Sequence, residues 1–264
     1  MTIDHIRPAD EGPYRPGPER GFLAGRTALV TGGAKRIGRA LALALAGEGA
    51  AVVLHYRNSV AEARNTAAAI EDRGGVCLLV AGDLADAEVA GELVAVAETA
   101  AGAPIDILVN NASIFGPGEA LDTPTGTWDL HHAVNLRAPF ILAREMARRL
   151  PAGRTGDVIN LNDIRALKPG SDHFPYTISK VGLHGLTRSL ALALAPHVRV
   201  NELLLGSILP PDSGYGDYVH TPVQEIPTRR FDTPVEVCRG MLALLANPAM
   251  TGQSLCIDGG RHLL

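Results

Sequence analysis

From residue 26 onward, short apolar runs alternate with longer segments rich in alanine, leucine and glutamate. Continuous apolar runs of this kind are typical of strands buried on both faces. They occur at residues 27–31, 51–56, 76–81, 106–110, 157–161, 198–204 and 254–257. Segments of helical length lie at residues 38–48, 60–73, 87–101, 127–150, 176–195 and 234–246. The alternation predicts an α/β fold, a doubly wound parallel sheet of about seven strands with helices on both faces.

Two stretches depart from this alternation. Residues 1–24 hold four prolines among acids and arginines, without the apolar run of a signal peptide, so we expect a flexible N-terminal arm. Residues 25–264 are then one domain. Within it, residues 206–230 are rich in proline and glycine and too long for an ordinary connection, which predicts a lid over a substrate site.

Composition narrows the functional classes. Hydrophobic residues make up 46% of the 264-residue chain, enough for one core, and a formal net charge of −4 gives no basic surface for nucleic acid or an anionic membrane. The longest apolar stretches fall short of the roughly 20 residues of a membrane span. The three cysteines lack CxxC spacing, which argues against disulfides and a metal site and favours the cytoplasm.

A glycine-rich turn, TGGAKRIGRA at residues 31–40, follows the first predicted strand and opens a helix. Glycine allows close approach of a ligand, and a helix N-terminus offers free N–H groups to a pyrophosphate. No Gly-Lys-Ser/Thr sequence ends the turn, which disfavours a triphosphate loop. The turn predicts cofactor contacts at Gly32, Lys35, Arg36, Ile37 and Gly38. An ordinary strand-to-helix turn with solvated basic side chains is the alternative.

The end of the second predicted strand indicates which nucleotide is bound. An acid there binds the adenosine ribose 2′-hydroxyl, whereas basic and hydroxyl groups accept a 2′-phosphate. This chain has no acid until Glu62. We therefore expect NADP(H), in contact with His55, Tyr56, Arg57, Asn58 and Ser59.

Tyr176 and Lys180 lie one helical turn apart, on one face of a predicted helix. A tyrosine has a pKa near 10 and exchanges its proton reluctantly at neutral pH. An ammonium ~4 Å away contributes ~4 kcal/mol at an effective dielectric of about 20, enough to lower that pKa by up to about three units. The alternative is a pair on the helix surface.

In this order and at these strand ends, the motifs resemble the short-chain dehydrogenase/reductase family, which has a single-domain Rossmann-type fold. The resemblance implies that Asp83 and Leu84 bracket the adenine ring and that Asn135 holds a water that relays protons to Lys180. It also implies further cofactor contacts at Asn111, Ala112, Ser113, Tyr176, Lys180 and Gly206.

One departure from the family changes the expected chemistry. The residue thirteen places before the tyrosine, usually serine, is Asp163. A serine steadies a carbonyl oxygen, whereas a carboxyl group can carry a proton to a ring nitrogen. The chain therefore indicates an imine-like C=N substrate rather than a plain ketone. Alternatively, Asp163 caps the local turn.

The departures together resemble the pteridine reductase branch, over about residues 26–261. They are Arg36 in place of glycine, HYRNS at 55–59, NNASIF at 110–115, and the Asp163, Tyr176, Lys180 set. The resemblance implies a homotetramer that reduces a dihydropterin or related pteridine with NADPH. Its catalytic residues would be Asp163, Tyr176, Lys180 and Asn135, and its substrate contacts Arg36, Ser113, Phe115, Asp163 and Tyr176.

Two other functions remain open from the sequence. One is a short-chain dehydrogenase/reductase acting on another cyclic imine, ketone or alcohol. In the branch a Pro-Gly pair follows the sixth strand, whereas this chain has Leu205-Gly206, at the start of the lid that selects substrate. The other is a non-catalytic sensor of NADP(H), for which the joint presence of Asn135, Asp163, Tyr176 and Lys180 has no use.

Overall fold

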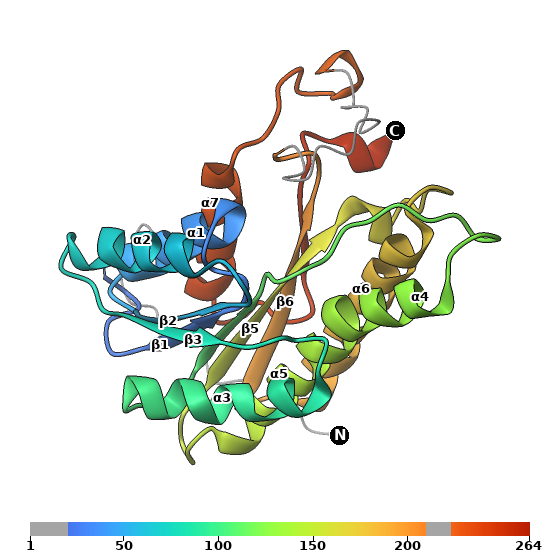
Figure 1. The fold of residues 1–264 in the computed structure, drawn as a ribbon. Helices are drawn as coiled ribbons and strands as arrows, with labels where there is room; N and C mark the ends of the chain where they lie inside the picture. Colours follow the sequence, from blue (N-terminus) through green and yellow to red (C-terminus); the bar gives the residue numbers. More distant parts are fainter. Residues whose placement is uncertain (1–20, 210–222) are drawn as a thin grey trace, which may run out of the picture.

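Seven parallel strands form one sheet in the order β3-β2-β1-β4-β5-β6-β7 (Figure 1). The structure, a computed structural model, describes residues 21–209 and 223–264. The strands are β1 (Thr27–Val30), β2 (Ala51–Tyr56), β3 (Cys77–Ala81), β4 (Ile107–Asn110), β5 (Gly156–Asp163), β6 (Val198–Leu205) and β7 (Ser254–Ile257). The predicted fold is thus confirmed. The largest difference is at β5, which continues to Asp163 because its last residues still pair with β6.

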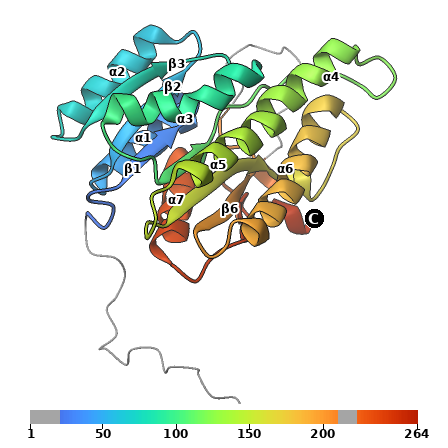
Figure 2. The same ribbon diagram turned by 90° about the horizontal axis from the view of Figure 1, so that it is seen from below.

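Helices cover both faces of the sheet (Figures 1 and 2). They are α1 (Arg36–Gly47), α2 (Val60–Glu71), α3 (Ala87–Ala101), α4 (Thr125–His132), α5 (Ala138–Arg149), α6 (Phe174–Ala193) and α7 (Pro234–Ala246). Alternate strand residues supply the two cores. Ala28 and Val30 pack under α1, α2 and α7, whereas Leu29 packs toward α3 and α5. No helix in the described part of the chain combines the length and apolar content needed to cross a bilayer.

The predicted helix over residues 127–150 is wrong in one respect. It is divided into α4 and α5 by a π-helical segment at Ala133–Arg137. The segment contains Asn135, whose buried side chain bonds to the main chain of Ile114 after β4. A π-helical turn aims a residue away from its regular helical position, and such turns are frequent at functional sites.

The first turn of the described chain belongs to the domain. Leu23 is only 1% exposed, its N–H donates to the carbonyl of Glu48, and the N–H of Gly21 donates to the Glu48 carboxylate. The flexible arm predicted for residues 1–24 is therefore wrong for residues 21–24. Residues 1–20, and residues 210–222 of the predicted lid, lie outside the described part.

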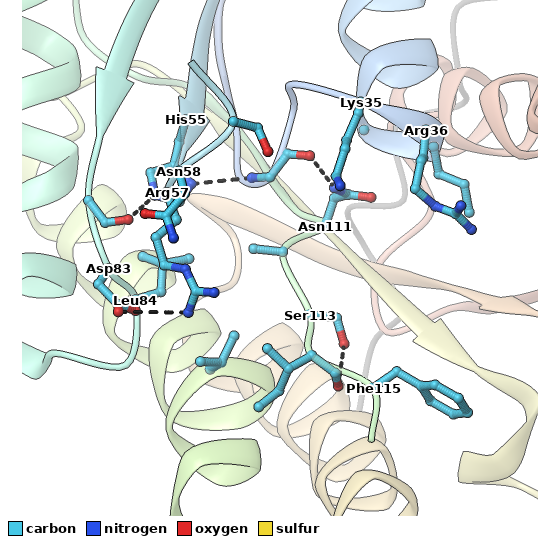
Figure 3. Close-up of a pocket in the computed structure, with 18 residues that line it drawn as sticks. Lys35, Arg36, His55, Arg57, Asn58, Asp83, Leu84, Asn111, Ser113 and Phe115 are labelled. Carbon is cyan, nitrogen blue, oxygen red and sulfur yellow. Dashed lines mark hydrogen bonds and ion pairs between the residues drawn. The ribbon is translucent and has the colours of Figure 1, made fainter. Parts of the chain in front are cut away.

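The order of the strands positions a ligand site. β1 lies between β2 and β4. After β1 the chain forms β2 and β3 on one side of this strand, and it then crosses to the other side of β1 to form β4. In doubly wound sheets this switch point opens a crevice at the carboxyl ends of the strands. A cavity of about 610 Å³ lies there (Figure 3).

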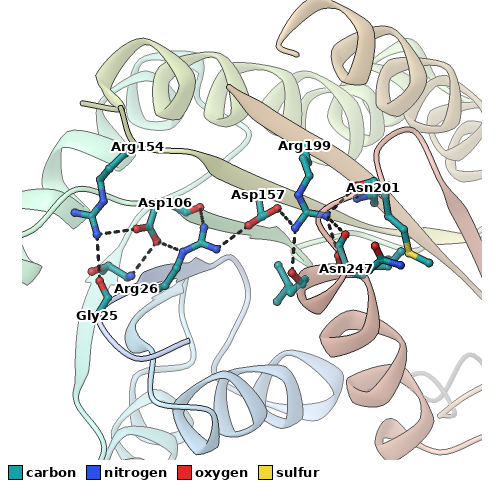
Figure 4. A network of polar contacts seen from close by, with 12 residues as sticks. Gly25, Arg26, Asp106, Arg154, Asp157, Arg199, Asn201 and Asn247 are labelled. Carbon is teal, nitrogen blue, oxygen red and sulfur yellow. Dashed lines mark hydrogen bonds and ion pairs between the residues drawn. The ribbon is translucent and has the colours of Figure 1, made fainter. Parts of the chain in front are cut away.

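At the amino ends of the strands, partly buried ion pairs between buried acids and arginines connect neighbouring strands (Figure 4). Arg26 bonds both Asp106 before β4 and Asp157 of β5, at 3.1 and 2.8 Å. Asp157 also pairs with Arg199 of β6 at 2.5 Å. The same guanidinium donates to the carbonyls of Leu244, Leu245, Asn247 and Met250 at and beyond the end of α7. These contacts satisfy carbonyls that a helix end leaves without partners.

Candidate active site

The turn after β1 is locked to the end of β4. The hydroxyl of Thr31 accepts the N–H groups of Asn111 and Ala112, both at 3.0 Å. The amide of Asn111 donates to the carbonyls of Thr31 and Gly32 at 2.9 and 3.0 Å. A Cβ at Gly38 would lie 2.2 Å from the oxygen of Gly32. Gly38 is therefore required for the helix to begin this close to the turn.

Most of the predicted cofactor residues line the first cavity (Figure 3). They are Gly32, Lys35, Arg36, Ile37, Gly38, His55, Arg57, Asn58, Ser59, Asp83, Leu84, Asn111, Ala112 and Ser113. Arg57 and Asp83 lie on one side of the view, and Arg36 and Phe115 on the other. Gly82, Ile114 and Val134 also line it and were missed, because apolar residues and a single glycine carry no motif.

The end of this cavity near β2 is basic. Arg57 is half exposed, and its only charged neighbour within the described residues is Asp83, at 3.8 Å. An exposed pair of this length holds the guanidinium weakly. Arg57, Asn58 and Ser59 line the cavity without an acid at the strand end. This end therefore suits a phosphate better than a ribose diol.

The side chains of His55 and Tyr56 lie on different sides of β2: His55 lines the cavity, and Tyr56 packs against the core. The Nδ1 atom of His55 accepts the N–H of Gly32 at 3.2 Å, and Nε2 lies 3.1 Å from the carbonyl of Gly82. Burial lowers the pKa of His55 to about 4, so the ring is neutral and links the turn to β3. The prediction for Tyr56 is corrected: its ring packs against the core under α1 and α2 instead of lining the cavity.

Arg36 has a backbone conformation that favours glycine, with φ of 55°. For a residue with a side chain this region costs about 1–2 kcal/mol. Arg36 lines this cavity and also a second one, and Phe115 lines both of them. Local strain of this kind persists where the surroundings impose it, commonly at ligand sites.

The second cavity, of about 260 Å³, is lined by three of the four predicted catalytic residues, Asp163, Tyr176 and Lys180, but not by Asn135. Asp163 ends β5 and faces α6, where the hydroxyl of Tyr176 donates to Asp163 Oδ2 at 2.9 Å. The other carboxylate oxygen, Oδ1, accepts the N–H of Arg165 at 2.8 Å and caps the short helix Ile164–Ala166. The turn-capping alternative for Asp163 is therefore confirmed, and the cap leaves the second carboxylate oxygen to the hydroxyl of Tyr176. Gly206 lines this second cavity rather than the first.

Lys180 is buried, with 3% exposure, and Tyr176 is 8% exposed, so the alternative of a surface pair is wrong. The Lys180 ammonium donates to the carbonyl of Leu161 at 2.8 Å and lies 5.6 Å from the centre of the Tyr176 ring. Burial lowers the pKa of Lys180 to about 8, against the opposing effect of Asp163 and Glu202. The buried ammonium of Lys180 therefore loses its proton at a lower pH than an exposed lysine does.

Asn135 fastens the segment after β4 to α6. Its Oδ1 accepts the N–H of Ile114 at 2.9 Å and the hydroxyl of Ser113 at 3.2 Å. Its Nδ2 donates to the carbonyl of Ile114 and to Ser179 Oγ, both at 3.0 Å. The side chain is fully used by these contacts. A side-chain contact of Asn135 with the predicted proton-relay water would therefore require one of these hydrogen bonds to break.

Phe115 lies at the junction of the first two cavities. Its ring stacks on His173 with a centroid distance of 4.2 Å and meets the Tyr176 ring edge-on at 4.8 Å. One face of Phe115 is thus covered by His173, and its position beside Tyr176 suits a flat ligand. His173 was missed because it belongs to no motif; it lies just before α6.

A third cavity, of about 530 Å³, continues from Phe115 and Asp163 toward the C-terminus. Lys168 and Arg261 line it, as do Arg165 and Asp172. The Arg165 guanidinium binds both oxygens of Asp172, at 2.7 and 2.9 Å, and holds the pKa of that carboxyl well below its usual range. No motif marks these residues, because the loop after β5 and the C-terminal turn are far apart in the chain.

Comparisons with known proteins agree over most of the chain. Residues 32–262 match the family described as Enoyl-(Acyl carrier protein) reductase. An L-rhamnose 1-dehydrogenase (NAD(P)(+)) of Sphingomonas is 32% identical over 92% of this chain and 98% of its own. A 3-oxoacyl-(acyl-carrier-protein) reductase of Synechocystis is 31% identical over 90% of this chain and 97% of its own.

Solved structures share the architecture. The FolM alternative dihydrofolate reductase 1 of Brucella canis, complexed with NADP, superposes with a TM-score of 0.84 and 38% identity, covering 92% of this chain and 96% of its own. A blue fluorescent protein from a metagenomic library, in complex with NADPH, has a TM-score of 0.82 and 29% identity, covering 90% of this chain and 98% of its own.

Proposed function

The chain belongs to the short-chain dehydrogenase/reductase family, and from this we propose that it is an NADPH-dependent reductase of a dihydropterin or related pteridine. The observation that carries the proposal is the hydrogen bond from Tyr176 to Asp163 at the carboxyl end of β5. A carboxylate in this place can exchange a proton with a substrate nitrogen, which the serine usual in the family cannot do readily.

The cofactor proposed is NADP(H), which supplies the hydride when bound. The first cavity fits it in three ways. Its glycines keep the turn close to the end of β4, its basic end suits the 2′-phosphate, and its inner end reaches Ser113 and Phe115. The solved relatives that hold NADP or NADPH support the same choice.

The residues of this chain handle the proton. Tyr176 holds one on its phenol oxygen, hydrogen-bonded to Asp163 Oδ2. Buried Lys180 contributes positive charge that favours release of this proton. Asp163 receives it or passes it to a ring nitrogen of the substrate, while the N–H of Arg165 keeps the carboxylate aimed at the cavity.

Phe115 orients the substrate in this account. A pterin is flat and aromatic, so its ring can pack against the side chain of Phe115, which lines both the first and the second cavity. Arg36 and Ser113 line the same cavity within reach of its polar edge. The dihydrofolate reductase name of the Brucella relative supports a pteridine ring, although other relatives are named for sugars and acyl thioesters.

A ketone, alcohol or other cyclic imine is the second candidate substrate, favoured by those relatives. A non-catalytic sensor is disfavoured, because burial of Lys180 beside Tyr176 and Asp163 has a cost that nucleotide binding does not require. A panel test separates the candidates. Purified protein is mixed with NADPH and one substrate at a time: dihydrobiopterin, dihydromonapterin, dihydrofolate or a simple ketone. The oxidation of NADPH is followed by the loss of its absorbance. We expect turnover of at least one pterin; turnover of the ketone alone would contradict the proposal.

We also propose a homotetramer in the cytoplasm. A tetramer with two-fold symmetry needs two separate self-complementary surfaces. One candidate is an apolar groove of about 640 Å³ over α4, α5 and α6, lined by Leu136, Phe140 and Leu186. The other is the outer edge of the sheet, where Leu255 of β7 and Val235 of α7 are exposed. Three unpaired cysteines are consistent with a reducing compartment.

A further inference from the structure

A buried carboxylate lies behind the catalytic lysine. Glu202 is in the middle of β6, between β5 and β7, and is fully buried. Its strand partners are Asn160 on one side and Ser254 on the other. The side chain faces α6, the helix that carries Tyr176 and Lys180. A charged residue in a central strand is rarely fully buried unless it is paired.

Three donors converge on Glu202, together with the Thr187 hydroxyl, whose single proton is shared with the closer carbonyl of Leu183 at 2.9 Å. Oε1 accepts from His184 Nδ1 and from the hydroxyl of Ser254, the latter at 2.6 Å. Oε2 accepts from Asn162 Nδ2 at 2.7 Å and, more weakly, from Thr187 Oγ1 at 3.4 Å. An ionised carboxylate offers about four acceptor positions, whereas a protonated acid must use one oxygen as a donor. This arrangement therefore fits the negatively charged form.

The network connects Glu202 to Lys180. Asn162 Nδ2 donates both to Glu202 and to the main-chain carbonyl of Lys180, at 3.2 Å. His184, the only cationic candidate bonded to Glu202 among the described residues, is one turn farther along α6. Its side chain is 20% exposed. Glu202 is thus bonded directly to a histidine that reaches solvent and is linked through Asn162 to the main chain of the buried lysine.

The charged and titratable groups around this place come from four elements. Asp163 belongs to β5, Tyr176 and His184 to α6, Glu202 to β6 and Cys256 to β7. The negative charge of Glu202 raises the pKa of Lys180, against the larger lowering by burial, and it also contributes to the raised pKa of the Cys256 thiol. Asp163 touches the proton-transfer site directly, so Glu202 is the negative charge near Lys180 that lies outside that site.

We propose that Glu202 is a positioning residue for the reaction: its buried negative charge, held by Asn162, His184 and Ser254, keeps Lys180 protonated at the working pH. A low-dielectric interior strengthens this interaction, because water screens it little. Lys180 can then favour proton release from Tyr176 although it is itself removed from water. The proposal depends on the proposed function only for the use made of Lys180, not for its protonation.

The test reads Lys180 directly, without any substrate. The chain has three lysines, Lys35, Lys168 and Lys180. Protein labelled with ¹³Cε-lysine and saturated with NADP⁺ therefore gives three titrating NMR signals, which Lys168→Arg helps to assign. In E202Q, which has the same shape without the charge, we expect the pKa of Lys180 to fall by about one pH unit. An unchanged value would overturn the proposal.

A matched variant separates charge from packing. His184→Gln keeps the carboxylate and can still donate an N–H to it, so the pKa of Lys180 should not fall. An equal fall in E202Q and H184Q would show that disturbed packing is the cause and would also overturn the proposal. Should E202Q fail to fold, Glu202→Met carries the same expectation, because a buried charge is often replaceable by an apolar side chain of similar volume.

The pH dependence of kcat/KM provides a second test. If Glu202 acts through Lys180, the alkaline decline of kcat/KM moves to lower pH in E202Q by the same amount, while the low-pH rate is less affected. A purely structural role would instead lower the rate by one factor at every pH. Failure of every pterin as a substrate would leave the NMR result standing, so the two proposals fail separately.

Discussion

Asp163 uses its two oxygens for two different purposes. One caps the turn after β5 and the other accepts the proton of Tyr176. The cap fixes the side chain, so the oxygen that we propose handles the proton is held at the second cavity. A serine here could still cap the turn. It would lack the carboxyl group that, in our proposal, carries a proton to a ring nitrogen of the substrate.

Removal of the phenol oxygen tests the proton donor. Tyr176→Phe should lower kcat by at least about 10²-fold, in the range of positioned acid catalysis. Binding of NADPH, followed by its fluorescence, should change little, because the glycine-rich turn and Arg57 are untouched. Turnover close to that of the unaltered protein would exclude Tyr176 as the donor.

The pH dependence follows from Lys180. Its pKa is lowered to about 8, so the ammonium is present below that pH and lost above it. Reduction needs the ammonium, and kcat/KM for the pterin should therefore fall as pH rises through about 8. A profile of kcat/KM from pH 6 to pH 10 measures this decline. If kcat/KM stayed unchanged up to pH 9.5, the account would be contradicted.

We propose that selection of the cofactor depends on the half-exposed guanidinium of Arg57. Arg57→Asp should raise the KM for NADPH by about 10- to 100-fold, the effect of losing a charge-assisted hydrogen bond of about 1.5–3 kcal/mol. The KM for NADH should change much less. Arg64→Asp is the matched control, since Arg64 is exposed on α2 and does not line the cavity. Equal effects of both substitutions would indicate a general loss of positive charge.

At the scale of elements, the sheet and its helices could be predicted from hydrophobic patterning. Strands such as β2 and β7 were predicted with their observed bounds, because buried strands leave short continuous apolar runs. The π-helical turn at Ala133–Arg137 could not be predicted this way. It depends on Asn135 bonding to Ile114, a contact between segments separated by about twenty residues.

Some residues of the candidate site could likewise be predicted from the sequence, and others could not. Residues at strand ends, such as Arg57 and Asp163, could be predicted because a parallel sheet gathers its carboxyl ends at one edge. His173 and Glu202 could not, since one depends on ring stacking and the other on how strand β6 faces α6. Tyr56 was wrongly included, because period-two alternation turns it away from the cavity.

The ion pairs at the amino edge of the sheet should stabilise the fold. Arg199→Ala leaves Asp157 with one fewer partner and several carbonyls beyond α7 without a donor. We expect a loss of about 3 kcal/mol in the free energy of unfolding. Urea unfolding, followed by the fluorescence of the single tryptophan at fixed protein concentration, measures it.

A surface pair provides the comparison. Arg149 lies 3.3 Å from Glu98, and its side chain is 41% exposed. Arg149→Ala should cost at most about 1 kcal/mol, since solvent screens an exposed pair. If both substitutions destabilise the protein equally, the network around Asp157 contributes no more than an ordinary surface contact.

On the scale of the whole molecule, three cavities follow one another along the carboxyl edge of the sheet. Phe115 borders all of them, and Asp163 and Gly206 border the second and third. A cofactor in the first would thus meet a substrate in the second at Phe115 and Tyr176. The third extends toward Lys168 and Arg261 and gives room for a substituent on the substrate ring.

Assembly can be tested through the apolar groove over α4, α5 and α6. Phe140→Glu places a charge in this groove and should reduce the tetramer to a smaller species, measured by light scattering after gel filtration. Val76→Glu, an exposed apolar residue just before β3, is the matched control and should leave the mass unchanged. A tetramer in both variants would mean that the groove is not an interface.

The central claim is that Asp163 makes this site a reductase of a ring C=N bond. The most direct measurement is kcat/KM for a dihydropterin and for a ketone, compared between the unaltered protein and Asp163→Ser. We predict that the variant loses at least about 10²-fold with the dihydropterin and loses less, or gains, with the ketone. A variant that reduces the dihydropterin as well as the unaltered protein would contradict the account.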